Sequence, residues 1–253
     1  MKKILIISAN PKNTDKLRLD QEVREIKAAI KLANNREQFE IVTSEAIRVE
    51  DLRRALLEHQ PAIVHFSGHG SGSTGLALEN NVGQVQLVST ESLARLFGLF
   101  QGKIECVLLN ACYSQAQAAA IHQHIDYVVG MNQAIGDMAA IEFAIGFYDA
   151  LGVGRPYEDC FEVGCASIDL QGIPESETPV LKARRRSSSS FDAETSGEQT
   201  QRKTNSRGVV LASEENNSQP KYSGGISQSL NGGQMYGGMQ AVQGNRNQET
   251  MTI

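Results

Sequence analysis

The stretch PAIVHFSGHG, residues 61–70, contains a short apolar run that ends in Ser67-Gly68-His69-Gly70. A run of this length followed by glycines is typical of a buried parallel strand, here with a histidine just beyond its carboxyl end. A second stretch, CVLLNACYS at residues 106–114, has the same form and places Cys112 after a predicted strand. In open α/β sheets, functional residues gather beyond the carboxyl ends of the strands. The two stretches therefore predict a thiol nucleophile, Cys112, with His69 as its base.

The rest of the apolar pattern predicts alternating strands and helices. Further strands are expected at residues 3–8, 39–43 and 127–131, with a short edge strand at 179–181 and a small hairpin at 76–79 and 84–88. Helices are expected at residues 19–32, from 49 to just before Pro61, and at 90–97, 114–124, 137–151 and 156–170. Thr14 or Asp15 is a candidate cap for the first helix. This alternation predicts an α/β fold with a mostly parallel sheet and helices on both faces.

Composition divides the chain into a folded part and a tail. Residues 1–181 contain 15 Lys and Arg against 23 Asp and Glu, and they hold nearly all of the apolar periodicity. Residues 182–253 contain 9 Lys and Arg against 6 Asp and Glu, and they are rich in Ser, Gly, Asn and Gln. We therefore expect one domain over residues 1–181, which is long enough to bury a core. A disordered linker over 182–221 and a Gly/Asn/Gln-rich tail over 222–253 would follow it.

The composition also limits the partners and the compartment. An acidic domain argues against broad binding to nucleic acid, and the basic run at residues 184–186 is interpreted as a solvated linker. The apolar run at residues 4–7 is too short for a signal peptide or a membrane segment. The four cysteines form no C-x-x-C pair, which favours reduced thiols and a cytoplasmic location.

Cys112 needs activation to act as a nucleophile, because an unperturbed thiol has a pKa of about 8.5. His69 and the N-terminus of the helix predicted from Ser114 would both favour the thiolate. The backbone N–H groups of Gly70 and Cys112 are candidates for an oxyanion hole. Asp137 is a candidate for the substrate pocket and equally for the cap of the helix that follows it.

Three other features favour structural interpretations. His65 lies inside its predicted strand and is expected to be a packed, hydrogen-bonded histidine. Residues 70–75, GSGSTG, match the pattern G-x-G-x-x-G, but a strand and not a helix follows, so we expect a mobile substrate loop and not a dinucleotide site. His122 and His124 lie two residues apart on a predicted helix and do not share a face. No metal site and no cofactor are expected.

Together these motifs resemble the CHAT family of caspase-like cysteine peptidases. The resemblance lies in IVHFSGHG and LLNACYS, with similar marks at residues 17–25, 130–148 and 179–181. It implies a caspase/hemoglobinase-like fold, a three-layer sandwich around a mostly parallel sheet, in a protein of bacterial or cyanobacterial type. It also implies that His69 and Cys112 form a dyad that hydrolyses peptide bonds in a protein or peptide substrate.

One departure from related peptidases concerns specificity. Metacaspases have an aspartate two residues before the cysteine, and this aspartate helps to bind a basic P1 side chain. Asn110 takes that position here, so a basic specificity does not follow from the resemblance. Two other functions stay open: a catalytically inactive caspase-like domain that serves as an interaction or assembly module, and a flavodoxin-like nucleotide-sensing domain.

Residues 222–250 suggest a second property of the chain. They are rich in Gly, Asn and Gln with spaced apolar residues, and Asn and Gln side chains can form ladders along a cross-β stack. Residues 241–245, AVQGN, resemble short amyloid-forming signalling motifs of bacteria that are related to RHIM segments. The resemblance implies self-assembly, or assembly with an upstream sensor, that would activate a signalling or defence effector by proximity. The alternative is an inert disordered tail.

Overall fold

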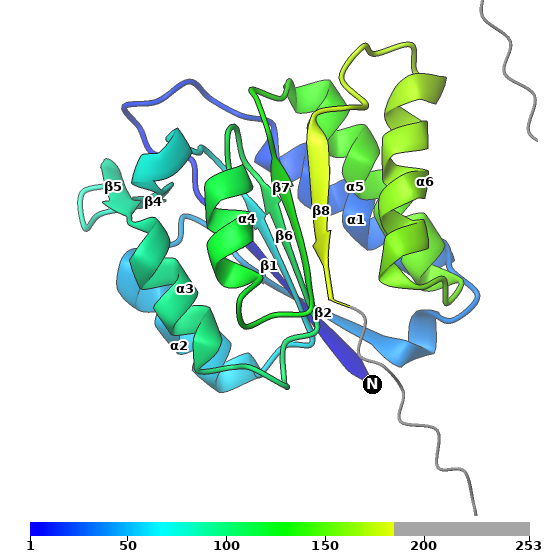
Figure 1. The fold of residues 1–253 in the computed structure, drawn as a ribbon, viewed down its shortest axis with the longest axis horizontal. Helices are drawn as coiled ribbons and strands as arrows, with labels where there is room; N and C mark the ends of the chain where they lie inside the picture. The colour runs from blue at the N-terminus through cyan, green and yellow to red at the C-terminus, as the bar shows by residue number, and fades with distance from the viewer. Residues whose placement is uncertain (185–253) are drawn as a thin grey trace, which may run out of the picture. The chain divides into compact units, whose positions relative to one another are not determined.

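The computed structural model describes residues 1–184, which form a sheet covered by helices (Figure 1). Six strands lie in the order β2-β1-β3-β6-β7-β8. Their bounds are Lys2–Ser8 for β1, Phe39–Ser44 for β2, Ile63–Ser67 for β3, Cys106–Asn110 for β6, Tyr127–Met131 for β7 and Pro179–Ala183 for β8. Neighbouring strands are parallel except β8, which pairs antiparallel with β7 at the edge of the sheet.

Helices cover both faces of this sheet, as Figure 1 shows. One face packs against α1 (Leu19–Leu32), α5 (Asp137–Gly152) and α6 (Tyr157–Leu170). The other face packs against α2 (Val49–His59), α3 (Thr90–Gly98) and α4 (Gln115–Ile121). A separate antiparallel hairpin, β4 (Leu76–Glu79) with β5 (Val85–Val88), lies in the connection between β3 and α3.

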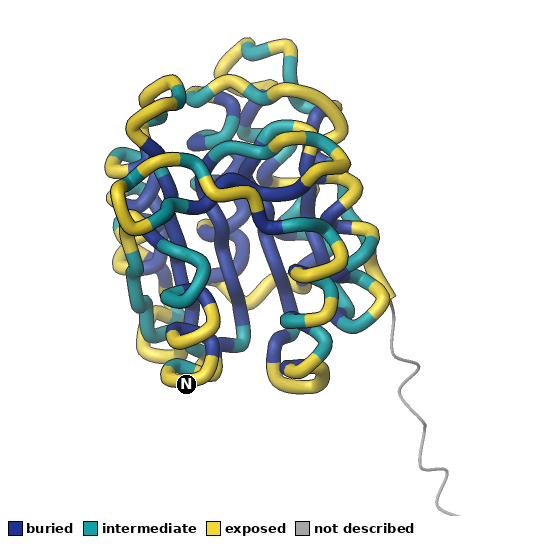
Figure 2. The backbone as a smooth tube through the Cα atoms, turned by 90° about the vertical axis from the view of Figure 1, so that its left-hand side faces the viewer, coloured by how far each residue is buried: buried dark blue, intermediate teal, exposed yellow. Residues whose placement is uncertain are grey.

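The central strands are apolar on both faces because each face meets helices. In β1, four consecutive residues from Ile4 to Ile7 are at most 1% exposed. In β3, Val64 and Phe66 belong to the core beside α2 and α3, whereas Ile63 belongs to the core beside α1 and α5. Figure 2 shows the buried strands inside and the exposed residues concentrated in the surrounding helices and loops.

The predicted α/β fold with helices on both faces of a mostly parallel sheet is confirmed, and the structure differs from the prediction in several details. Arg18 is the N-cap residue of α1 and makes no side-chain cap, so capping by Thr14 or Asp15 was wrong. The helix predicted at 114–124 ends at Ile121, because the chain then turns to bury Ile125 before β7.

The first residues of the predicted linker are described and are ordered: β8 extends through Lys182 and Ala183, so the sheet continues past the predicted domain boundary at residue 181. The rest of the predicted linker, residues 185–221, and the Gly/Asn/Gln-rich tail lie outside the described residues. Within residues 1–184, no helix has both the length and the apolar character that crossing a membrane requires.

Two glycines allow α5 and α6 to pack closely. A Cβ atom on Gly146 would lie 2.7 Å from the carbonyl oxygen of Val163. A Cβ atom on Gly164 would lie 2.8 Å from the ring of Phe143 and 2.9 Å from its carbonyl oxygen. Because backbone atoms cannot move aside as a side chain does, any larger residue here would push the helices apart.

We expect Gly164→Ala to lower the free energy of unfolding, measured by urea denaturation of the full chain. Overpacking costs roughly 1–3 kcal/mol, which exceeds the gain of up to about 1 kcal/mol from the better helix propensity of alanine. The control is Glu162→Ala, an exposed position of the same helix, with an expected change within about 0.5 kcal/mol. A Gly164→Ala variant as stable as the wild type would contradict this account of the packing.

Candidate active site

The predicted base and nucleophile leave neighbouring strands of the sheet at the same edge. In the parallel pairing of β3 with β6, Ser67 lies opposite Asn110, so His69 and Cys112 each follow two residues later. The N–H of Gly68 donates to the carbonyl of Asn110 at 3.3 Å, which holds the two segments together beyond the sheet. A Cβ atom on Gly70 would overlap the carbonyl oxygen of Cys112. Only glycine permits this close approach.

One small cavity, about 40 Å³ in volume, brings the predicted side chains together. Its lining includes His69, Cys112 and Asp137, which come from the ends of β3 and β6 and from the start of α5. The walls are mostly apolar, and the other lining residues are Leu17, Arg18, Leu19, Glu22, Gly68, Asn110, Ala111, Ile135, Ala140 and Ile141. We define these thirteen residues as the Cys112 cavity.

His69 is oriented by a main-chain carbonyl. Its Nε2 lies 2.8 Å from the carbonyl oxygen of Asp15. Because a carbonyl oxygen can only accept, Nε2 must hold the hydrogen, and a neutral ring then has its free lone pair on Nδ1. Sequence reasoning missed Asp15, since a residue that acts through its main chain leaves no signal in its side-chain type.

The half-buried Cys112 contacts the segment before α5. Its Sγ accepts a hydrogen bond from the N–H of Ile135 at 3.5 Å and lies 3.7 Å from the Ile135 carbonyl oxygen. The next residue, Tyr113, has a φ of 55°, in the left-handed region, and its N–H donates to the carbonyl of Gln133 at 3.1 Å. This sharp turn leads from β6 into α4, which starts at Gln115.

The two N–H groups predicted for an oxyanion hole form no hydrogen bond within the described part of the chain. Within residues 1–184, neither the N–H of Gly70 nor that of Cys112 donates to a protein acceptor. The contact between Gly70 and the backbone of Cys112 brings these two segments together. Neither donor is therefore occupied by an acceptor of residues 1–184.

Asp137 is a lining residue of the cavity and not a helix cap. The N-cap of α5 is Gly136, whose N–H donates to Oε2 of Glu175 at 2.7 Å. The Oδ2 atom of Asp137 instead accepts from the N–H of Arg18 at 3.3 Å. The capping alternative was therefore wrong, because the side chain points toward α1 and the cavity.

The glycine-rich loop after His69 accepts hydrogen bonds from two neighbouring helices, which we did not expect of a mobile loop. It contains a short 3-10 turn, Gly72–Thr74. The fully buried Gln117 donates from Nε2 to the carbonyl of Gly72 at 2.7 Å and to Oγ1 of Thr90 at 2.6 Å. The hydroxyl of Thr90 in turn donates to the carbonyl of Ser73 at 3.1 Å. As predicted, strand β4 and no helix follows this loop.

A buried polar cluster lies beneath the cavity. Oε1 of Glu22 accepts from Nδ2 of Asn110 at 2.6 Å and lies 2.8 Å from Nε2 of His65. The other ring nitrogen of His65 lies 3.2 Å from the hydroxyl of Tyr148. His65 is fully buried, and its prediction as a packed, hydrogen-bonded histidine is confirmed.

Sequence reasoning missed Glu22, although a signal for it was present. Glu22 is only 3% exposed. It lies on the apolar face of α1, between Leu19 and Ile26, where helical spacing calls for an apolar residue. A carboxylate on that face is rarely buried without a partner.

A cysteine and a histidine beyond adjacent strands of such a sandwich are typical of the caspase-like cysteine proteases. Residues 2–162 match the model of the CHAT domain family. The chain therefore belongs to the CHAT domain family.

The relatives agree with this class. The chain is 32% identical over 157 residues to a Roc-COR-CHAT protease from an unknown prokaryotic organism, a match that covers 59% of this chain and 15% of that protein. It is 23% identical over 174 residues to a probable protease of Gillisia limnaea, a match that covers 67% of this chain and 31% of that protein. The chain thus spans less than a third of the length of these curated relatives.

A solved structure has the same fold. The Arg-specific cysteine proteinase gingipain R superposes with a TM-score of 0.53 at 12% identity, covering 71% of this chain and 45% of that chain. At this identity the likeness concerns the fold alone. Among residues 1–184, no three His, Cys, Asp or Glu side chains are grouped in a way that would hold a metal ion.

The four thiols differ in their surroundings, which predicts an order of reactivity. Burial raises the pKa of Cys160 and of Cys165 to about 12, and it raises the pKa of the fully buried Cys106 well above its ordinary value. A raised pKa keeps these groups as unreactive thiols through neutral pH. Cys112 and Cys165 are both half-buried, but of the two only Cys112 lines the cavity.

We expect iodoacetamide at pH 7.5 to alkylate Cys112 first, measured residue by residue by mass spectrometry. A pKa of about 12 leaves about three orders of magnitude less thiolate than the ordinary value of about 8.5. Labelling of Cys160 and Cys165 should therefore stay slow until the pH approaches 12. The urea-unfolded chain, in which all four thiols should react alike, is the control. Native Cys165 reacting as fast as Cys112 would refute this order.

Proposed function

We propose that this chain is a cysteine endopeptidase in which Cys112 is the nucleophile and His69 is the general base. The main support is that both side chains line one cavity, at the ends of two adjacent parallel strands. The contact of Gly70 with the Cys112 backbone supports the same assignment. Membership of a family with protease-named relatives supports peptide bonds as the substrate class.

In the proposed reaction, Nδ1 of His69 takes the proton of the Cys112 thiol, and Sγ attacks the carbonyl carbon of the scissile peptide bond. The oxyanion that forms accepts hydrogen bonds from the N–H groups of Gly70 and Cys112. His69 then gives its proton to the departing amine, which leaves a thioester on Cys112. Water attacks this thioester with His69 again as base, and the free acid and the thiol are restored.

Two main-chain groups support these steps. The Asp15 carbonyl holds the hydrogen on Nε2 of His69, so the basic nitrogen is the other one. The N–H of Ile135 donates to Sγ of Cys112, which holds the sulfur beside the segment that precedes α5. Neither contact depends on the side chain of its residue.

Cleavage of a proteome-derived peptide library by the purified chain tests the proposal. We expect cuts after a consistent P1 residue, and we expect both Cys112→Ala and His69→Ala to slow cleavage by at least about 10³-fold, as for other activated nucleophiles. Cys165→Ala, which removes a thiol outside the cavity, should keep full activity. Cleavage that survives in Cys112→Ala would show that another group performs the reaction.

The library also tests the alternative of an inactive assembly module, which predicts no Cys112-dependent cleavage under any condition. We propose that residues 222–250 bring copies of the chain together and raise its activity by proximity, supported by their Gly/Asn/Gln-rich composition. Thioflavin-positive fibres and higher activity are expected of the full chain and not of a chain ending at residue 184. Equal activity and no fibres from either chain would contradict this role.

A further inference from the structure

We propose that the Cys112 cavity is the pocket for the P1 side chain and that it selects arginine or lysine through the carboxylates of Glu22 and Asp137. The inference rests on the proposed peptidase function and adds the substrate class. The P1 side chain branches from the residue whose carbonyl the thiol attacks, so a pocket that Cys112 itself lines is the one it enters.

The cavity combines the apolar walls and the carboxyl groups that a long cationic side chain requires. Leu17, Leu19 and Ile141 supply apolar walls, which suit the aliphatic stem of arginine or lysine. Glu22 and Asp137, from α1 and α5, supply carboxylates to the same cavity.

Within residues 1–184, both hydrogen bonds of the Glu22 carboxyl group are made by Oε1, with Asn110 and His65. Burial raises the pKa of Tyr148 well above its ordinary value, so its hydroxyl keeps its hydrogen. Within residues 1–184 that hydroxyl has one partner, Nδ1 of His65. A neutral His65 accepts there and donates from Nε2 to Glu22, whereas a protonated His65 would leave the Tyr148 hydrogen without an acceptor. The neutral form of His65 therefore satisfies the hydrogen bonds of both Tyr148 and Glu22.

Two buried polar atoms at the ends of β3 and β6 lack partners, and one of them belongs to Asn110, which lines the cavity and contacts Glu22. Asn110 is 6% exposed and uses both amide hydrogens, one on Glu22 and one on the carbonyl of Ala140 at 3.0 Å. Its Oδ1 and the hydroxyl of Ser67, paired with it across β3 and β6, have no hydrogen-bond partner in the described chain. Buried polar atoms normally have partners. A guanidinium group, with five N–H donors and no acceptor, would supply hydrogen bonds to such oxygens.

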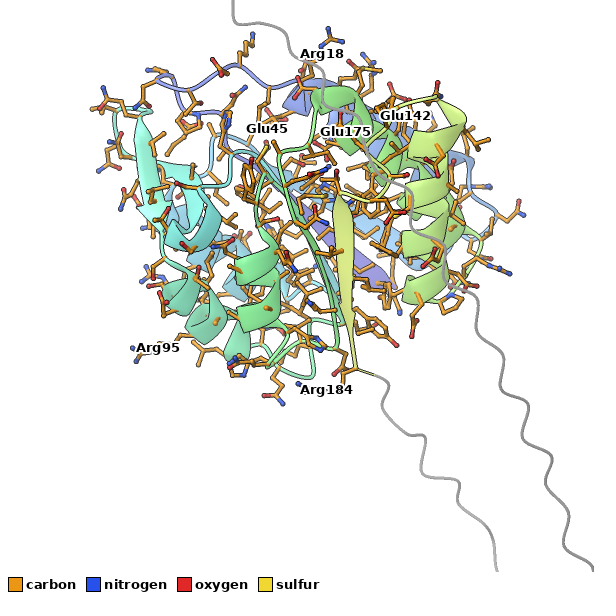
Figure 3. The ribbon with its side chains drawn as sticks, turned by 45° about the horizontal axis from the view of Figure 1, so that its top comes forward. Arg18, Glu45, Arg95, Glu142, Glu175 and Arg184 are labelled. Atoms are coloured by element: carbon orange, nitrogen blue, oxygen red, sulfur yellow. The ribbon has the colours of Figure 1, made fainter. Side chains whose placement is uncertain are left out.

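The nearby arginine does not neutralise the pocket. Arg18 lines the cavity and donates its main-chain N–H to Asp137. Its side chain is exposed, with Nη1 4.0 Å from the sulfur of Met138, and Figure 3 shows it at the outer margin of the molecule. Within residues 1–184, neither Glu22 nor Asp137 forms an ion pair with a Lys or Arg. The substrate would supply the missing cation.

The test uses three peptidyl acyloxymethyl ketones that differ only at P1: arginine, citrulline and norleucine. Citrulline has nearly the shape of arginine without its charge, so the comparison isolates the electrostatic contribution. The rate of covalent labelling of Cys112 in the full chain is followed by mass spectrometry. We expect the arginine probe to react at least tenfold faster than the citrulline probe and faster than the norleucine probe.

Variants then assign the selectivity to residues. Glu22→Gln and Asp137→Asn should each reduce the ratio of the arginine rate to the citrulline rate at least severalfold. Asp20→Asn, the same change of charge at an exposed position of α1 outside the cavity, should keep the wild-type ratio. Thermal melting checks the fold of each variant. If Glu22→Gln does not fold, the proposal is tested by the arginine-to-citrulline rate ratio of the wild type and by the change of that ratio in Asp137→Asn.

Equal rates for arginine and citrulline, fastest reaction of norleucine, or ratios unchanged in both acidic-residue variants would overturn the proposed pocket while leaving the peptidase proposal intact. Failure of all three probes to label Cys112 would be a separate outcome. If no probe labels Cys112 although iodoacetamide does, the pocket proposal fails, and Cys112-dependent cleavage of the peptide library decides whether the peptidase proposal stands.

Discussion

The candidate site depends on the contact between two backbone segments at the carboxyl ends of β3 and β6. Parallel pairing sets Ser67 opposite Asn110, and the segments remain in contact as far as Gly70 and the Cys112 carbonyl, where no Cβ atom fits. Both strands are buried on both faces. The relative position of base and nucleophile is therefore fixed by the packing of the core, which holds functional groups more closely than flexible loops do.

The polar cluster beneath this contact is costly unless all of its members are present. A buried carboxylate loses several kcal/mol of hydration, and the hydrogen bonds that Glu22 receives from Asn110 and His65 offset that loss. Leaving one buried partner unsatisfied costs about 1–3 kcal/mol, more for a charged group. Apolar side chains would fill the same space at lower cost, so the position of the cluster against the cavity favours a functional interpretation over a purely structural one.

The sequence was sufficient for the features that depend on periodicity, and it failed for those that depend on tertiary contacts. Apolar runs and glycines located the strands, and with them His69 and Cys112, because each lies at a fixed distance after a buried strand. Helix capping by Asp137 was wrong, since its carboxylate faces a residue more than a hundred positions earlier, Arg18. Asp15 acts through its main chain, and the two partners of Gln117 come from two other elements, so no local pattern indicates either role.

The loop between β1 and α1 links substrate recognition to proton transfer in the proposed reaction. Its Asp15 carbonyl orients His69, and its Arg18 N–H holds Asp137 at the cavity, while the side chain of Asn10 closes the loop through two hydrogen bonds of its own. Each neutral hydrogen bond contributes only about 1 kcal/mol net, so no single contact fixes the loop. A side chain that fills the cavity would pack against this same segment. Occupancy of the pocket would then stabilise the loop conformation in which the base is correctly oriented, and a substrate that leaves the pocket empty would lose part of that orientation.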